Sequence, residues 1–560
     1  MPRSNTDPFT LEIIQNAFQA ICDEMFTTLR RTAMSSIIYE NLDFGVAITD
    51  AQGRLACQGS GLPGFIGMLD SGAKHAIEKF GAQGQIRPGD IFVTNDPYAG
   101  GVSHLNDVVL VLPVFSEGEI VAWMANKAHW SDIGGMNPGS LTTSSTEIFQ
   151  EGLQLPQIKL FSEGVVNQAI IDIIAANSRT PDQILGDMWA GIAAVRAGEK
   201  RLLDLLARYG KQTVCFAIAR YLEDGQRAAL RALKQLPKGV FTAEDATEDG
   251  QPIRVTITVT DEHFTVDLRG NPKQSATPFN CPYMCTWSAA QIIFKAITDP
   301  HGITNDGTFT CLSVLCDDSS IFNAKRPAPV SRYSEPLMQV IDLIWKAAAT
   351  GMPNKLPAGQ MNSVSSVMLG GRNRKTGVLG ILIEPQVGGW GACVDVDGEN
   401  AQMCAASGET YNGSIEVSEA RYGVLVRSYQ LRVDDLAGDG EYRGGKGIIK
   451  EFEVLLEDAW LTSTHTRGTT RPWGMRGGAS GSSNRLDVIK PNGQRQRFTR
   501  VERFNLQIGD VVRVETASGG GCGDPMTRSR HSILADIRDG FVTTEYAERL
   551  YGIRRSAESR

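Results

Sequence analysis

The chain has 560 residues, of which 42% are hydrophobic and 21% are charged. Three or four domains' worth of chain can bury large cores without disulfide bonds or structural metals, so a small disulfide-stapled protein is excluded. The formal net charge of −8 argues against a polybasic nucleic-acid-binding protein, and the modest charged fraction argues against a disordered chain.

The longest apolar stretches, such as residues 108–115, are about eight residues long, whereas a membrane-spanning helix needs ~20. The N-terminus has no apolar segment of the kind found in secretory signals, so we expect a cytoplasmic protein with reduced cysteines. The closest cysteine pairs, Cys281 with Cys285 and Cys311 with Cys316, form no CxxC motif, which argues against a zinc finger.

The first 240 residues mix helix and strand patterns. Asp7-Pro8 is typical of a helix start, and apolar residues at spacings of three and four predict a helix as far as Leu29. Further elements are predicted in chain order: strands on both sides of a turn at 50–53, a helix near 69–80, a strand at 91–94, a hairpin of 108–115 and 120–128, and a helical layer over 165–235.

The second half of the chain is richer in strand patterns. Alternation begins at about residue 252, and two helices interrupt it at 285–297 and 336–350. Later strands are predicted at 424–433, 450–456 and 511–516, and a helical hairpin at 530–552.

These patterns predict an α+β fold: a multi-subdomain body with an N-terminal mixed α/β part, a helical layer and a β-rich C-terminal half. The expected domains are an N-terminal part that carries the candidate metal site (1–240), a central α+β part (241–435), a β-rich part (436–528) and a helical tail (529–560).

Histidine is scarce, with seven in the chain, so local clustering is informative. His104 and Asp107 lie at the entry to the 108–115 strand, and His129 lies at the exit of its partner. If the loop is 117–119, the antiparallel register pairs Asp107 with His129, with side chains ~5 Å apart. A two-residue loop would instead place these two residues on opposite faces.

Two imidazoles and a carboxylate at a strand end suit a divalent transition metal with an open position. The alternative is that His104 and His129 are ordinary loop residues that hydrogen-bond to the backbone. Asp43 precedes a strand and is a candidate fourth ligand, or else a turn residue. Asp96 is a candidate orienting residue or base, or a turn former.

Nucleotide-binding and hydrolase motifs are missing. The sequence contains no GxxxxGK[ST], GxSxG or HExxH, which argues against nucleotide binding by this chain alone, a serine hydrolase and a simple metalloprotease. The run 519–525 favours a structural glycine turn close to another backbone over an anion-binding nest. The loop 134–140 is a better prospect for covering a site.

Eight motifs in order along the chain resemble the hydantoinase B/oxoprolinase family. Among them are NDPYAGGVSHLND at 95–107, AHWSDIGGMNPGS at 128–140, NCPYMC at 280–285, RPWGMRGG at 471–478 and GGGCGDP at 519–525. The resemblance covers essentially the whole chain.

The resemblance implies a B-type subunit that forms a heteromer with a hydantoinase A-type subunit, an ATP-binding protein of the ASKHA class. Family members hydrolyse cyclic amides such as hydantoins, 5-oxoproline and lactams, and related members carboxylate ketones. In the implied mechanism the partner, which binds ATP with magnesium, phosphorylates the substrate oxygen. A metal-held water, or bicarbonate in the carboxylases, then reacts in the B-type subunit.

The family's metal site maps onto His104, Asp107 and His129, with Asp43 as the further ligand, for zinc, manganese or iron. The resemblance favours the hydrolase branch because Asp43 is present. Asp96 or Asp132 is then a candidate acceptor of the water proton.

Two departures from the family pattern are Trp130, where a second histidine often follows His129, and Cys522, where an aromatic residue is usual. Trp130 is expected to alter the pocket.

The resulting prediction is an ATP-dependent cyclic amide hydrolase subunit. The alternatives are an ATP-dependent ketone carboxylase subunit and a non-catalytic assembly scaffold.

Overall fold

The computed structural model describes residues 7–65, 67–374, 376–408 and 410–552. These residues divide into two compact units. Unit 1 lies within Met1–Thr242, Ile253–Ile344 and Ala405–Gly413, and unit 2 lies within Ala243–Pro252, Trp345–Cys404 and Ser414–Arg560.

Unit 1 is built on a seven-stranded antiparallel sheet with the order β2-β1-β5-β4-β3-β6-β7. The strands are β1 (Phe44–Asp50), β2 (Leu55–Gln58), β3 (Ile91–Thr94), β4 (Asp107–Ser116), β5 (Glu119–His129), β6 (Ile158–Ser162) and β7 (Val165–Val166). The predicted hairpins around 50–53 and 117–119 therefore lie side by side in one sheet.

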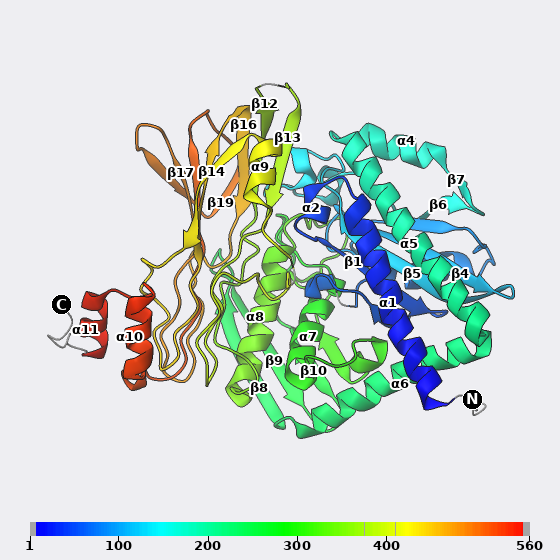
Figure 1. Cartoon of the computed structure of the whole chain (residues 1–560), viewed down its shortest axis with the longest axis horizontal. Helices are drawn as coiled ribbons and strands as arrows, with labels where there is room; N and C mark the ends of the chain where they lie inside the picture. The colour runs from blue at the N-terminus through cyan, green and yellow to red at the C-terminus, as the bar shows by residue number, and fades with distance from the viewer. Residues whose placement is uncertain (1–6, 66, 375, 409, 553–560) are drawn as a thin grey trace. The chain divides into compact units, whose positions relative to one another are not determined.

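Helices cover this sheet. Figure 1 shows α1 (Pro8–Thr32) and α5 (Pro181–Tyr209) running across β1, β5 and β4. On β4, Leu110 faces Gly191 of α5, whereas Val109 and Val111 face α3 (Ser71–Ala76). Because both faces are covered, the first eight residues of β4 are all buried, which explains their continuous apolar sequence.

The predicted helix starts and the helical layer are confirmed. Asp7 caps α1 by accepting a hydrogen bond from the backbone N–H of Thr10 at 3.0 Å. The layer consists of α4 (Gln168–Asn177), α5 and α6 (Lys211–Gln235), and a short α2 (Ser36–Tyr39) follows α1.

The turn of the central hairpin differs from the predicted one. It has two residues, Glu117 and Gly118, both with positive φ, as expected for a type I′ turn. That length alone would put Asp107 and His129 on opposite faces. A β-bulge restores the register, because Phe115 pairs with Ile120 whereas Val114 pairs with Ala122.

A four-stranded sheet follows, with the order β11-β10-β9-β8 and a parallel β10–β11 pair. Its strands are β8 (Gly239–Ala246), β9 (Pro252–Val259), β10 (Phe264–Asp267) and β11 (Leu312–Leu315). The helices α7 (Tyr283–Thr298) and α8 (Ser334–Gly351) confirm the two predicted interruptions.

Unit 2 contains two sheets that share one apolar core, with the orders β13-β12-β16-β19 and β14-β15-β20-β17-β18. The strands are β12 (Val367–Asn373), β13 (Leu379–Glu384), β14 (Val424–Leu431), β15 (Ile448–Val454), β16 (Leu456–Thr464), β17 (Arg485–Ile489), β18 (Arg495–Phe498), β19 (Arg500–Asn505) and β20 (Val511–Glu515). The helices are α9 (Ile415–Tyr422), α10 (Arg530–Arg538) and α11 (Thr544–Tyr551).

The glycine run of unit 2 is a site of close backbone packing, as the sequence favoured. A Cβ on Gly519, Gly520 or Gly521 would overlap a backbone carbonyl oxygen of Trp390, Trp473 or Asp439, respectively. Only glycine allows these segments to approach so closely.

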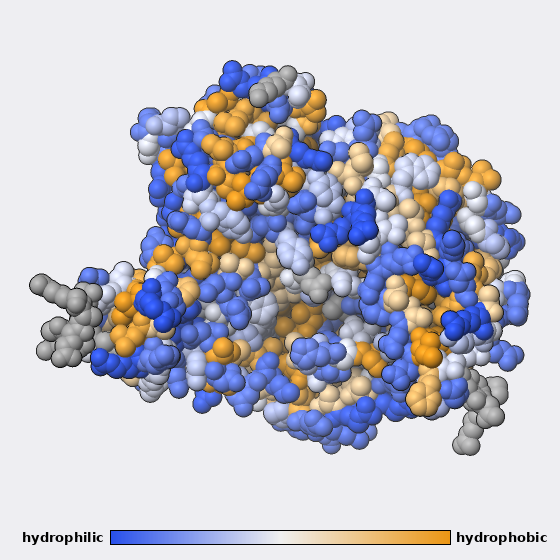
Figure 2. Space-filling model, viewed as in Figure 1, coloured by the Kyte–Doolittle hydropathy of each residue, from blue (hydrophilic) through white to orange (hydrophobic). Residues whose placement is uncertain are grey.

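The α+β class is confirmed. Figure 2 shows apolar side chains interspersed with hydrophilic ones on the visible face. Among the described residues, the helices are too short or too polar to span a bilayer.

Candidate metal centre

The central hairpin brings three predicted ligands together at one end. Asp107 and His129 are directly paired at the start of β4 and the end of β5, and His104 lies in the segment just before β4. Nε2 of His104 is 3.2 Å from Nδ1 of His129. Oδ1 of Asp107 is 3.5 Å from the first nitrogen and 3.6 Å from the second. We call these three residues the His/Asp cluster.

The cluster is buried. The exposed fractions of His104, Asp107 and His129 are 4%, 1% and 5%. Oδ1 of Asp107 accepts no hydrogen bond from the described protein atoms, although an ionised oxygen in such a place normally needs a partner. The described protein atoms also offer no hydrogen-bond partner to the outer ring nitrogens, Nδ1 of His104 and Nε2 of His129.

Burial and neighbouring charges set the protonation of the cluster. Burial acts to lower the pKa of His129, but Asp107 and Asp43 outweigh it and raise that pKa above its ordinary value. Burial lowers the pKa of His104 to about 4, against the pull of Asp107, so this imidazole is neutral near pH 7. Burial also acts to raise the pKa of Asp107, but Lys127 and the two imidazoles outweigh it and hold that pKa well below its usual range. A neutral imidazole and an ionised carboxylate are the forms that bind a metal ion.

Asp43 lies beside the cluster. The backbone N–H of His129 donates to the Asp43 carbonyl oxygen at 3.1 Å, which ties the end of β5 to the start of β1. Oδ2 of Asp43 is 3.9 Å from Nδ1 of His129, and its side chain is 24% exposed. Burial raises the pKa of Asp43 to about 6.

Three neighbours of the cluster were not predicted from the sequence. Nζ of Lys127 is 3.1 Å from Oδ2 of Asp107, and the Ser103 hydroxyl donates to the same oxygen. The ring of Tyr333 packs on that of His104 with centroids 4.9 Å apart. Lys127 carried a signal, because it lies two residues before His129 and so shares its face, on which the preceding residues Val121, Trp123 and Ala125 are apolar.

The other two predicted acids hold loops. Asp96 accepts a hydrogen bond from the backbone N–H of Tyr98 at 2.9 Å and pairs with Arg326 at 3.2 Å. Asp132 accepts from the backbone N–H groups of residues 134, 139 and 179 and from the Arg179 side chain. Their roles as proton acceptors stay predictions.

Glu151 joins two loops near the cluster. Its buried carboxylate accepts hydrogen bonds from the Ser145 hydroxyl at 2.7 Å and from the backbone N–H groups of Val330 and Ser331 at 3.0 and 2.9 Å. The second loop leads into Tyr333. Burial raises the pKa of Glu151 to about 7, and the three donors moderate that rise.

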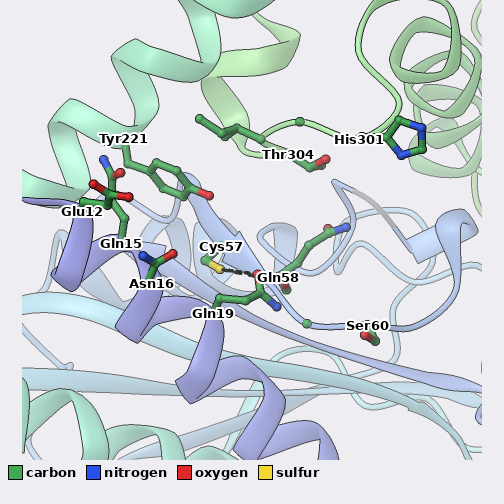
Figure 3. Close-up of a pocket in the computed structure, with 13 residues that line it drawn as sticks. Glu12, Gln15, Asn16, Gln19, Cys57, Gln58, Ser60, Tyr221, His301 and Thr304 are labelled. Carbon is green, nitrogen blue, oxygen red and sulfur yellow. Dashed lines mark hydrogen bonds between the residues drawn. The ribbon is translucent and has the colours of Figure 1, made fainter.

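Unit 1 also has a polar cavity of about 640 Å³. Figure 3 shows its lining, which comes from α1, the end of β2, α6 and the loop after α7. The Cys57 thiol lies 3.5 Å from Oε1 of Gln19 within it. The cavity contains none of the predicted site residues.

Comparisons with known proteins agree over the length of the chain. The family model described as Hydantoinase B/oxoprolinase matches residues 7–525. An uncharacterized protein of Methanocaldococcus jannaschii is 33% identical over 98% of this chain and 96% of its own. The B-type subunit of a putative D-/L-hydantoinase of Pseudomonas sp. strain NS671 is 30% identical over 98% and 95%, respectively.

Two solved structures share the fold. The crystal structure of ATP-dependent caprolactamase from Pseudomonas jessenii has a TM-score of 0.91 and 26% identity, covering 100% of this chain and 98% of that chain. A nucleotide-free acetone carboxylase structure has a TM-score of 0.90 over 99% of this chain and 80% of that chain, and at 19% identity it shows likeness of fold alone.

Proposed function

Because the chain belongs to the hydantoinase B/oxoprolinase family, we propose that it is the metal-dependent B-type subunit of an ATP-dependent enzyme that opens cyclic amides. One relative is named as the B-type subunit of a hydantoinase, and another, at 29% identity over 98% of this chain, as the caprolactamase beta subunit. Both names denote subunits, which supports a partner. We propose an ATP-binding A-type subunit for that role.

The single observation that carries the metal proposal is the His/Asp cluster. Around a tetrahedral ion with bonds of about 2.0–2.2 Å, neighbouring ligand atoms lie about 3.4 Å apart. The three separations in the cluster, 3.2, 3.5 and 3.6 Å, are close to that value. The unpartnered Oδ1 of Asp107 faces both ring nitrogens, so the donor set fits a divalent cation.

His104, Asp107 and His129 would hold the metal, and Asp43 would approach it as a further ligand from the partly exposed side. A divalent metal at such a site supplies a Lewis acid and lowers the pKa of a water molecule toward neutrality. The chain itself contributes the neutral imidazole of His104 and the ionised carboxylate of Asp107. Burial of the cluster keeps bulk water from competing for these groups.

ATP would enter the reaction through the partner subunit. An unstrained amide resists attack by water at neutral pH, and phosphorylation of its oxygen creates a far better electrophile. This chain has no GxxxxGK[ST] motif. We propose that the A-type partner activates the ring and that this chain opens it. Two separate subunits would then explain both the need for ATP and the missing nucleotide-binding motif in this chain.

A ketone carboxylase is the second candidate function, and its support is the acetone carboxylase fold. The two functions differ in their products. Ring opening adds water and no carbon, whereas carboxylation incorporates labelled bicarbonate into a ketone.

The function is tested with the chain co-expressed and co-purified with a hydantoinase A-type subunit. We expect ATP-dependent opening of hydantoin, 5-oxoproline or caprolactam by the wild type, measured by mass spectrometry of the products. The His104→Ala, His129→Ala double variant should lose both bound metal and activity. His75→Ala, a histidine outside the cluster, should keep both. Retention of full metal content and activity by the double variant would refute the proposal and favour a structural role for both histidines.

A further inference from the structure

Lys127 is a charged side chain in a place that rarely holds one. It lies in the middle of the seven-stranded sheet with no exposed surface. Its Nζ is 3.8 Å from the centre of the Phe65 ring and 3.4 Å from Sδ of Met68. These contacts are weak compensation for a buried ammonium, so the Asp107 carboxylate is its principal partner.

The two oxygens of Asp107 have different surroundings. Oδ2 receives both the Lys127 ammonium and the Ser103 hydroxyl. Oδ1 receives neither and faces the nitrogens of His104 and His129. Since both donors act on one oxygen, they fix the rotation of the carboxylate about its bond to Cβ.

Among the described residues, Asp107 is the member of the cluster whose side chain accepts hydrogen bonds from groups outside the cluster. Metal-binding histidines usually donate their outer N–H to a carboxylate or carbonyl, which orients the ring. The outer nitrogens of His104 and His129 have no such partner among the described protein atoms. The orientation of the cluster therefore depends on the groups that hold Asp107.

We propose that Lys127 is a positioning residue that, together with Ser103, turns a single oxygen of Asp107 toward the two imidazoles and so shapes the site for a divalent cation. This inference rests on the proposed metal-dependent function. It assigns a task to a residue that is not among the proposed metal ligands.

Simple electrostatics predicts the opposite effect, which makes the inference testable. A fixed positive charge close to a cation site repels the cation, so removing that charge should strengthen metal binding. If Lys127 instead orients Asp107, removing it should weaken binding. Loss of an outer partner of a metal ligand typically costs 10–100-fold in metal affinity, on the order of the effect expected here.

The experiment uses the purified full chain, stripped of metal and titrated with Zn²⁺ against a fluorescent chelator. Lys127→Met keeps most of the length of the side chain but removes its charge and its N–H donors, and we expect binding about 10–100-fold weaker. Lys127→Gln keeps an N–H donor without the charge and should bind more tightly than Lys127→Met. Equal affinities in both variants, or tighter binding in Lys127→Met than in the wild type, would overturn the inference.

Lys159→Met is the matched control. Lys159 also pairs with a buried aspartate, Asp90, at 2.8 Å and also lies over a phenylalanine ring, that of Phe92, but it is far along the sheet on β6. This variant should bind Zn²⁺ like the wild type. If Zn²⁺ affinity fell equally in Lys159→Met and Lys127→Met, the loss would be due to general destabilisation, and the inference would be overturned.

A crystal structure of a Lys127 variant separates this inference from the metal proposal. In Lys127→Met, or in Lys127→Leu if the first variant does not fold, we expect the Asp107 carboxylate to rotate so that Oδ1 leaves one or both imidazole nitrogens. An unchanged carboxylate would contradict the positioning role. Failure of the wild type to bind any metal would refute the proposed function, and the position of this carboxylate would still decide the role of Lys127.

Discussion

Each unit contains a buried lysine paired with a carboxylate. In unit 1, Lys127 lies 3.1 Å from Asp107 and over the ring of Phe65. In unit 2, Lys450 of β15 lies 2.8 Å from Glu384 of β13 and 4.5 Å from the centre of the Tyr429 ring. The side chains of both pairs are at most 1% exposed.

The two pairs differ in what surrounds the carboxylate. Two imidazole nitrogens lie within 3.6 Å of the second oxygen of Asp107. Among the described residues, groups of three metal-ligating side chains occur at His104, Asp107 and His129 and not around Glu384. A buried ion pair by itself is therefore weak evidence of function, and the convergence of further ligands on its free oxygen is the informative feature.

The largest expected effect comes from His104→Ala, which leaves His129 alone beside the Lys127–Asp107 pair and so brings the unit 1 site closer to the pair of unit 2. Because Lys127 and Asp107 remain paired, the chain should fold. We expect loss of stoichiometric metal by elemental analysis and a fall of more than about 100-fold in ring-opening activity, beyond that for an outer partner. A folded variant that keeps its metal would show that the imidazole is not a ligand.

Lys450→Met tests whether the buried pair of unit 2 contributes to stability alone. Removing one partner of a buried pair leaves an uncompensated charge, and we expect the free energy of unfolding to fall by about 3–5 kcal/mol. Metal affinity should not change. Chemical denaturation measures the free energy of unfolding, and Zn²⁺ titration measures the metal affinity. A large loss of metal affinity in Lys450→Met would show that the two pairs do not differ in function.

Glu151 is a buried carboxylate held by neutral donors in place of a lysine, and it gives the next largest effect. Its pKa of about 7 in the folded state lies above its ordinary value of 4.5, so the folded state binds the proton more tightly. Its contribution to stability is therefore largest below pH 4.5 and falls as the pH rises toward 7, by about 3 kcal/mol in total.

Glu151→Gln should remove this pH dependence. Unfolding free energies of wild type and variant, measured between pH 5 and 8, should converge or cross as the pH rises. The exposed Glu117→Gln is the control and should follow the wild type. Parallel curves for wild type and Glu151→Gln would show that this carboxyl has no raised pKa.

The smallest expected effect lies at the opposite end of the same hairpin. Gly118 has φ near 80° and open space where a Cβ would stand. Gly118→Ala should therefore cost about 1 kcal/mol of stability through backbone strain alone. Thermal unfolding measures this cost, and Zn²⁺ affinity should stay at the wild-type value because the bulge, not the turn residue, sets the register of the cluster.

The sequence predicted the pairing of Asp107 with His129 but not how it arises. Alternation located both strands, yet the turn has two residues where three were expected. The pairing survives because a bulge near Val114 adds the missing residue. Bulges leave little trace in a single sequence, since they depend on packing against neighbouring strands.

Long-range pairing explains most of what the sequence missed. The strands β12 and β13 were not predicted, because β12 is held by β16, about ninety residues later, and its Gly370-Gly371 weakens the strand pattern. Lys127 was overlooked for a related reason. Its contact with Asp107 depends on the conformations of both side chains, which the strand register alone does not give.

The most direct test of the central claim is anomalous diffraction from crystals of the full chain loaded with Zn²⁺ or Mn²⁺. We expect one strong peak at bonding distance from Nε2 of His104, Nδ1 of His129 and Oδ1 of Asp107. A metal-loaded crystal with no peak at that position would contradict the metal proposal.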